Sequence, residues 1–197
     1  MGHQTKVTGV ILAGGLARRM NNQDKGLVLF QGQPMVGYAL TAIEPLVNSV
    51  IVNANRNRTD YEQFGWPVVA DQNGNFEGPL AGILAAMRYA ETGILLVMPC
   101  DSPLVQTRHL QKLLTGHAES GADIAVAYDG ERLHPVFLAI KTSLESSLQD
   151  YLASGQRKID RWLAQHKMIK VDFSHEPEVF VNVNTLSELS SLEGEHG

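Results

Sequence analysis

The chain has 197 residues, of which 44% are hydrophobic and 19% are charged, a composition that is typical of a folded globular domain. Its formal net charge of −5 at pH 7 argues against nucleic acid or an anionic membrane surface as a partner. Its single cysteine, Cys100, excludes an internal disulfide and a metal site built from cysteines alone, and it favours a reducing, cytoplasmic location.

Short apolar runs alternate along the chain with longer segments of helical periodicity. The expected strands cover residues 7–13, 49–54, 67–70, 94–98, 123–128, 135–140, 168–173 and 179–183. The expected helices cover residues 34–47, 59–64, 80–91, 106–117, 143–154, 158–166 and 186–192. Short strands joined through helices predict an α/β fold in three layers, with a mostly parallel central sheet and helices on both faces. We expect a single domain over residues 1–197, with residues 1–6 and 193–197 frayed.

The first expected strand leads into the segment LAGGLARRMNNQDKG, residues 12–26. In an open α/β sheet, ligands bind beyond the carboxyl ends of the strands. Gly14 and Gly15 allow backbone N–H groups to approach a ligand closely, and Arg19 and Lys25 supply cationic donors that suit phosphate. On these residues alone, a glycine turn with solvated basic side chains is an equal alternative.

Six motifs, this segment included, follow one another in order along nearly the whole chain. The other five are VNANR at 52–56, GPLAG at 78–82, PCDSP at 99–103, DGERLHP at 129–135 and FVNVNT at 180–185. Together they resemble the nucleotidyltransferases that activate sugars and cofactors, in particular the molybdenum cofactor guanylyltransferases. The resemblance implies a Rossmann-like nucleotidyltransferase fold in a single guanylyltransferase domain. The chain departs from the usual family pattern at Asn21 and Asn22, where the family has two glycines.

The resemblance implies that GMP is transferred from GTP to the terminal phosphate of molybdenum-bound molybdopterin. Pyrophosphate is released, and the guanine dinucleotide form of the cofactor is made. It also implies Mg²⁺ as a cofactor, and other molybdenum-cofactor biosynthesis proteins and apo-molybdoenzymes as partners. One alternative is a nucleotidyltransferase of the same fold that uses CTP or a sugar phosphate. Another is a noncatalytic carrier of GTP or cofactor, which Asn21 and Asn22 favour and the intact Lys25 and Asp101 disfavour.

Two aspartates follow expected strands and have a physical reason to bind a nucleotide. Asp101 comes after a buried strand, where one carboxylate can hold Mg²⁺ together with waters and phosphates, although a helix cap or turn is the alternative. Asp71 can accept the two adjacent N–H donors of guanine, although a simple turn aspartate is the alternative. Asn55 and Arg56 are further candidates beside Asn53.

By resemblance, the site residues fall into groups. The catalytic group is Arg19, Lys25 and Asp101, and Asp101 is also the expected metal ligand. The expected GTP contacts are Leu12, Ala13, Gly14, Gly15, Lys25, Asn53, Asp71, Gly78 and Asp101. The expected molybdopterin side comprises Gly82, Asn182 and Asn184, and the two asparagines would share one face of a strand with Val181 and Val183 on the other. A capping role for Asn184 is the alternative. The histidines form no metal-ligand spacing, and we expect His109 and His117 at the surface.

Overall fold

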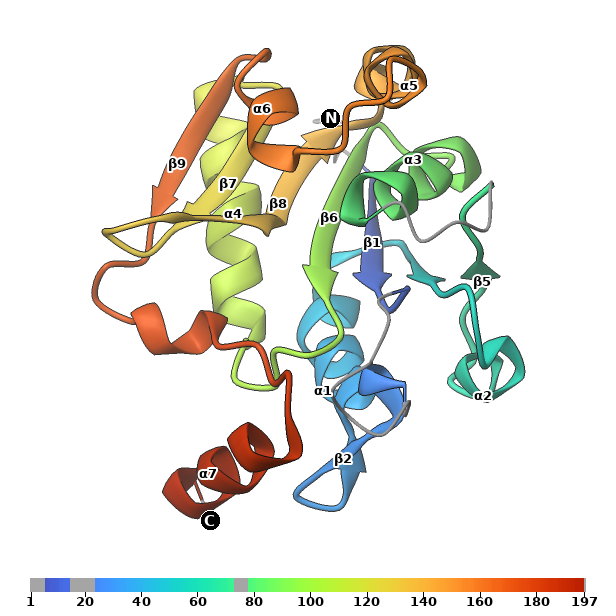
Figure 1. Cartoon of the computed structure of the whole chain (residues 1–197). Helices are drawn as coiled ribbons and strands as arrows, with labels where there is room; N and C mark the ends of the chain where they lie inside the picture. Colours follow the sequence, from blue (N-terminus) through green and yellow to red (C-terminus); the bar gives the residue numbers. More distant parts are fainter. Residues whose placement is uncertain (1–5, 15–23, 73–77, 197) are drawn as a thin grey trace.

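A mostly parallel sheet forms the centre of the computed structural model, which describes residues 6–14, 24–72 and 78–196 (Figure 1). Within these residues the sheet has seven strands in the order β5-β4-β1-β6-β8-β7-β9. They are β1 (Val7–Leu12), β4 (Ser49–Asn53), β5 (Val68–Val69), β6 (Ile94–Pro99), β7 (Ile124–Tyr128), β8 (Leu133–Lys141) and β9 (Met168–Asp172). Only β8 runs antiparallel to its neighbours, so the predicted sheet type is confirmed.

Helices cover both faces of this sheet. The α-helices are α1 (Met35–Ile43), α2 (Arg58–Glu62), α3 (Pro79–Tyr89), α4 (Thr107–Ser120), α5 (Glu145–Ala153), α6 (Ile159–Leu163) and α7 (Leu186–His196). The 3₁₀ helices are η1 (Lys25–Leu27), η2 (Glu44–Leu46), η3 (Thr142–Leu144) and η4 (Pro177–Phe180). Residues of α1 and α4 share one buried apolar cluster with Ile11, whereas α3, α5 and α6 share another with Val10. Both faces of β1 are therefore buried, as a sheet between two helical layers requires.

A third apolar cluster lies beyond the carboxyl edge of the sheet. It joins Phe30 and Met35 to Val183, Leu189 and Leu192. It thereby packs α7 against a small ribbon of two strands, β2 (Leu29–Phe30) and β3 (Gln33–Pro34) (Figure 1). This contact fixes the start of α7 close to the ends of β1 and β6. None of the helices in the described ranges is both long and apolar enough to cross a bilayer.

The expected strand at 179–183 is wrong. The 3₁₀ helix η4 begins at Pro177, and an extended connection without a ladder partner follows it. The N–H of Val183 instead donates to the backbone oxygen of Asp101, at 2.9 Å. Val183 is fully buried while Val181 is 44% exposed, so the two valines do not share one face.

The expectation that His109 and His117 lie at the surface is also wrong, because both are buried. Nδ1 of His109 accepts the N–H of Gln106 at 2.9 Å and so closes the first turn of α4. Burial lowers the pKa of both imidazoles, which favours their neutral forms. A histidine that replaces the usual acidic side chain of a capping box has no clear signal in the sequence.

Candidate functional site

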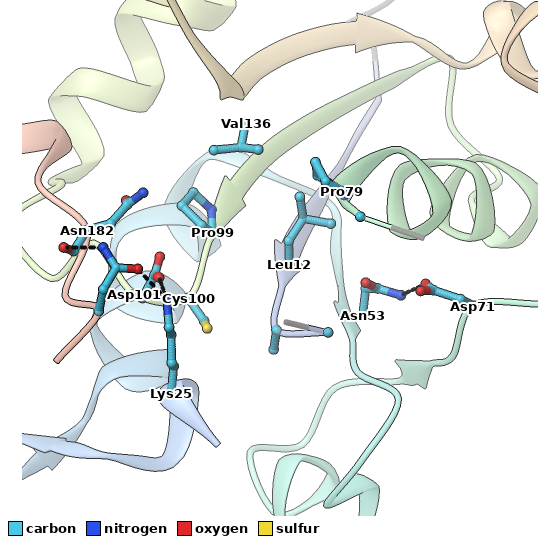
Figure 2. A pocket seen from close by; sticks show the side chains of 14 residues that line it. Leu12, Lys25, Asn53, Asp71, Pro79, Pro99, Cys100, Asp101, Val136 and Asn182 are labelled. Atoms are coloured by element: carbon cyan, nitrogen blue, oxygen red, sulfur yellow. Dashed lines mark hydrogen bonds and ion pairs between the residues drawn. The ribbon is translucent and has the colours of Figure 1, made fainter. Parts of the chain in front are cut away.

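A cavity of about 440 Å³ opens at the carboxyl edge of the sheet, where β1, β4 and β6 end (Figure 2). Its volume lies within the range of small-molecule binding sites. The lining residues are Leu12, Ala13, Gly14, Lys25, Asn53, Asp71, Gly78, Pro79, Pro99, Cys100, Asp101, Val136, Asn182 and Asn184.

Ten of the residues that the sequence singles out thus lie in the wall of one cavity: Leu12, Ala13, Gly14, Lys25, Asn53, Asp71, Gly78, Asp101, Asn182 and Asn184. Gly82, on α3, is not among the residues that line the cavity, and its nearest side chain is that of Asn53. Gly15, Arg19, Asn21 and Asn22 lie outside the described residues.

Four lining residues have no place among the predicted ones: Pro79, Pro99, Cys100 and Val136. Pro79 follows Gly78, while Pro99 and Cys100 directly precede Asp101. Their position next to a predicted site residue in the sequence could therefore have indicated that they line the cavity. Val136 comes from the antiparallel strand β8, whose position next to β6 no local pattern reveals.

One end of the cavity is built around the ammonium group of Lys25. Its Nζ donates to Oδ2 of Asp101 at 3.0 Å and to Oδ1 of Asn184 at 2.6 Å (Figure 2). The three side chains come from η1, from the turn after β6 and from the segment before α7. A lysine ammonium has three N–H donors, so within the described residues one donor remains for a ligand. This end is therefore a preorganised cation beside a carboxylate.

Asn184 is held in place by the start of α7. Its backbone N–H donates to Oε2 of Glu188 at 2.7 Å. The N–H of Thr185 donates to the same oxygen at 3.1 Å, and the N–H of Glu188 donates back to Oγ1 of Thr185 at 3.1 Å. This reciprocal arrangement is a capping box, which satisfies the free N–H groups of a helix start. Next to it, Oγ of Ser102 donates to Oδ1 of Asn182 at 2.6 Å. Hydrogen bonds to Glu188 and Ser102 thus hold Asn184 and Asn182 in place, although neither residue belongs to a strand.

The other end of the cavity is built around Asp71. Nδ2 of Asn53 donates to Oδ1 of Asp71, and Nδ2 of Asn55 donates to Oδ2, each at 2.8 Å. Asn55 also accepts the backbone N–H of Asp71 at 2.8 Å, which makes the pair reciprocal. Each carboxylate oxygen has more than one lone pair, so Asp71 retains acceptor capacity for a ligand. Asn55, which does not itself line the cavity, therefore orients the Asp71 carboxylate through these two hydrogen bonds.

Whether the cavity can bind a metal ion depends on which carboxylates line it. Among the described residues there is no group of three or more His, Cys, Asp or Glu side chains that could form a complete metal site. Mg²⁺ in phosphate-transfer sites is commonly bound by one or two carboxylates, with phosphate oxygens and waters completing the shell. Asp101, in the cavity wall beside Lys25, fits such a site.

Cys100 lies in the wall of the same cavity and is buried. Burial raises the pKa of its thiol well above the usual range, and the nearby Asp101 acts in the same direction. Because the thiolate is the reactive form, this cysteine is not set up as a nucleophile. Among the described residues, the cavity therefore supports charge stabilisation and not covalent catalysis by a thiol.

A cation at one end, an acceptor for N–H donors at the other and a sheet edge between them are the features of a nucleotidyltransferase. Residues 9–169 match the family described as the MobA-like NTP transferase domain. The chain belongs to this family.

Relatives with similar sequences align with this chain over almost its full length. A molybdenum cofactor guanylyltransferase from Shewanella loihica is 45% identical over 187 residues, which cover 95% of each chain. One from Shewanella amazonensis is 46% identical with the same coverage. Among solved structures, molybdopterin-guanine dinucleotide biosynthesis protein A from Archaeoglobus fulgidus superposes with a TM-score of 0.80 over 96% of this chain and 98% of its own, at 21% identity. That last similarity establishes the shared fold.

Gly82 leads to a testable prediction, because its α-carbon faces the side chain of Asn53. A Cβ at this position would overlap Oδ1 of Asn53 and push the amide off Asp71. We expect Gly82→Ala to raise KM for the nucleotide about tenfold, the scale of one lost hydrogen bond to a charged group. Gly116→Ala is the matched control, because it too adds a Cβ in a helix against a buried side chain, Val171. Equal kinetics of the two variants in a pyrophosphate-release assay would contradict the prediction.

Proposed function

We propose that the protein transfers GMP from GTP to the terminal phosphate of molybdenum-bound molybdopterin and releases pyrophosphate. The product is the guanine dinucleotide form of the molybdenum cofactor. The names of relatives that are 45% and 46% identical support this activity. The observation that carries it is the junction at which Lys25 meets Asp101 and Asn184 in the wall of the cavity.

The reaction forms a bond between an acceptor phosphate oxygen and the α-phosphorus of GTP, and it breaks the bond from that phosphorus to pyrophosphate, which leaves with the electron pair. A phosphate monoester has a second pKa of about 6, so at neutral pH it is largely dianionic and needs no general base. The demand is to bring two anions together and to stabilise the leaving charge. Lys25, Arg19 and the backbone N–H groups near Gly14 and Gly15 are proposed to do this.

Asp101 is proposed to hold Mg²⁺. The ion, when bound, would neutralise negative charge on the phosphate groups. The ion pair with Lys25, at 3.0 Å, holds the Asp101 carboxylate in the cavity wall. Both groups are therefore assigned to the triphosphate of GTP.

The base of GTP is assigned to the Asp71 end of the cavity, and molybdopterin to the asparagines beside Lys25. Asp71, braced by Asn53 and Asn55, is proposed to accept the adjacent N–H donors of guanine, a donor pair that adenine lacks on that edge. Leu12, Ala13 and Gly78 would complete the nucleotide side. Asn182 and Asn184 are proposed to face molybdopterin. Gly82 is close to Asn53, so we assign it to the position of that amide instead.

The test uses purified protein with GTP, Mg²⁺ and molybdenum-loaded molybdopterin. We expect release of pyrophosphate and a product with the mass of the guanine dinucleotide. CTP in place of GTP is expected to give little product, and comparable turnover with CTP would assign the protein to a CTP-dependent activity. Binding of GTP in calorimetry without any turnover would instead identify a carrier.

We further propose that residues 1–197 act as one guanylyltransferase domain and that the enzyme works in the cytoplasm, where its single cysteine would stay reduced. Its protein partners are proposed to be other molybdenum-cofactor biosynthesis proteins and the apo-molybdoenzymes that receive the product. If an apo-molybdoenzyme co-purifies with the protein only when the protein carries the finished cofactor, this assignment is supported. If no apo-molybdoenzyme co-purifies even when the cofactor is present, the assignment is contradicted.

A further inference from the structure

Asp24 is a buried carboxylate next to Lys25 that has no role in the site described so far. It is only 5% exposed, although a carboxylate at a chain turn is usually solvated. The hydroxyl of Tyr61 donates to its Oδ1 at 2.5 Å, and Nδ2 of Asn57 approaches its Oδ2 at 3.4 Å. Burying a charged group is costly unless it is well paired. The charge of Arg56 and the backbone N–H of Gly26 favour the Asp24 carboxylate alongside these two contacts.

Tyr61 contacts the turn of Lys25 through more than this one bond. It is fully buried on α2, and a Cβ added at Gly26 would overlap its hydroxyl, so the ring lies directly on the backbone that follows Lys25. The backbone oxygen of Asp24 accepts the N–H of Leu27 at 3.0 Å and closes η1. The carboxylate and the carbonyl of one residue thus both fix the short turn that carries Lys25.

The segment from Asn53 to Tyr61 also leads to the opposite end of the cavity. Asn53 and Asn55 bond to Asp71, while Asn57 and Tyr61 bond to Asp24. One continuous stretch, from the end of β4 into α2, therefore braces both Asp71 in the cavity wall and Asp24 beside Lys25. Tyr61 thus contacts Asp24, the residue before Lys25, and neither Tyr61 nor Asp24 lines the cavity.

We propose that Tyr61 is a positioning residue for guanylyl transfer, whose hydroxyl holds Asp24 and thereby sets the place of the Lys25 ammonium against the triphosphate. This inference rests on the proposed function for its substrate. Asp24 and Tyr61 do not line the cavity, so they act through Lys25 and not on the reacting atoms.

Tyr61→Phe is the first test, because it removes the hydroxyl and leaves the buried ring. Tyr151→Phe is the matched control, since Tyr151 is also buried and its hydroxyl donates to the backbone oxygen of Lys158 at 2.7 Å, in α5 and away from the cavity. We expect a similar fall in Tm for both variants. Only Tyr61→Phe should lower kcat/KM for GTP, by about tenfold, with KM for molybdopterin unchanged. Equal activity of the two variants would overturn the proposal.

Asp24 provides a second test through a conservative rescue. Asp24→Asn keeps an oxygen that can accept the hydroxyl of Tyr61, whereas Asp24→Ala removes it. We expect Asp24→Asn to stay within about threefold of wild-type kcat/KM and Asp24→Ala to lose at least about tenfold. Equal losses in both variants would refute a role through this hydrogen bond.

The Kd for GTP, measured by calorimetry, separates the failure of this inference from the failure of the proposed function. If the wild type binds GTP but forms no dinucleotide, the guanylyltransferase assignment fails. Weaker GTP binding by Tyr61→Phe than by Tyr151→Phe would still support positioning of Lys25. If the wild type forms the dinucleotide and both variants bind GTP equally, the guanylyltransferase assignment stands and the positioning role fails.

Discussion

Lys25→Ala is expected to lower kcat/KM for dinucleotide formation by at least ~100-fold, the effect of removing one preorganised charge contact to a transition state. The ammonium group contacts both Asp101 and Asn184, so it joins three segments of the cavity wall. Its removal takes away a donor for the triphosphate and leaves the Asp101 carboxylate without its partner. Pyrophosphate release, measured at saturating Mg²⁺, gives the rate.

Lys141→Ala is the control for this variant. Lys141 also pairs with an aspartate, since its Nζ donates to Oδ1 of Asp123 at 2.8 Å, but it lies opposite Ile94 at the amino end of β6. The control is expected to keep near-wild-type kinetics. A Lys25→Ala enzyme with a rate close to that of Lys141→Ala would refute the assignment of Lys25. Lys25→Arg is expected to recover little, because a planar guanidinium does not replace a compact ammonium in this junction.

Asp101→Asn is expected to cost at least ~100-fold in rate as well. The amide keeps an oxygen that can accept from Lys25 but loses the negative charge, so the shape of the wall is kept while the proposed Mg²⁺ ligand is weakened. The variant should therefore need a higher Mg²⁺ concentration for half-maximal activity. A titration of rate against Mg²⁺ tests this directly.

The control for Asp101 is Asp123→Asn, which removes the carboxylate of the remote ion pair. Its Mg²⁺ dependence is expected to match that of the wild type. An unchanged Mg²⁺ requirement in Asp101→Asn would mean that this carboxylate does not hold the ion. A loss of rate without that shift would assign Asp101 to the orientation of Lys25 alone.

The sequence was sufficient to predict the sheet and much of the cavity wall. Strands buried on both faces, such as residues 94–98, are apolar throughout, so the change to polar residues marks the carboxyl end of each strand. That rule leads to Gly14, Asn53, Asp71 and Asp101, and the structure brings all four to one cavity.

Contacts between distant segments could not be predicted in the same way. The alternation in residues 179–183 is typical of a strand, but a strand also needs a neighbouring edge, and here Val183 bonds to a single carbonyl at Asp101. Asp24 and Tyr61 are 37 positions apart, and neither has a local feature that predicts the other as a partner. Hydrogen-bond partners of this kind follow from tertiary packing and have no periodicity.

The single cysteine of the chain provides an intrinsic chemical reporter. Cys100 lies in the cavity wall, and because its thiol is buried and its pKa is raised, alkylating reagents should modify the resting protein slowly. The alkylation rate of the unmodified protein then measures how often the cavity wall opens. Occupancy of the cavity by a nucleotide should slow that rate further, so mass spectrometry of a timed alkylation can follow ligand binding without any engineered label.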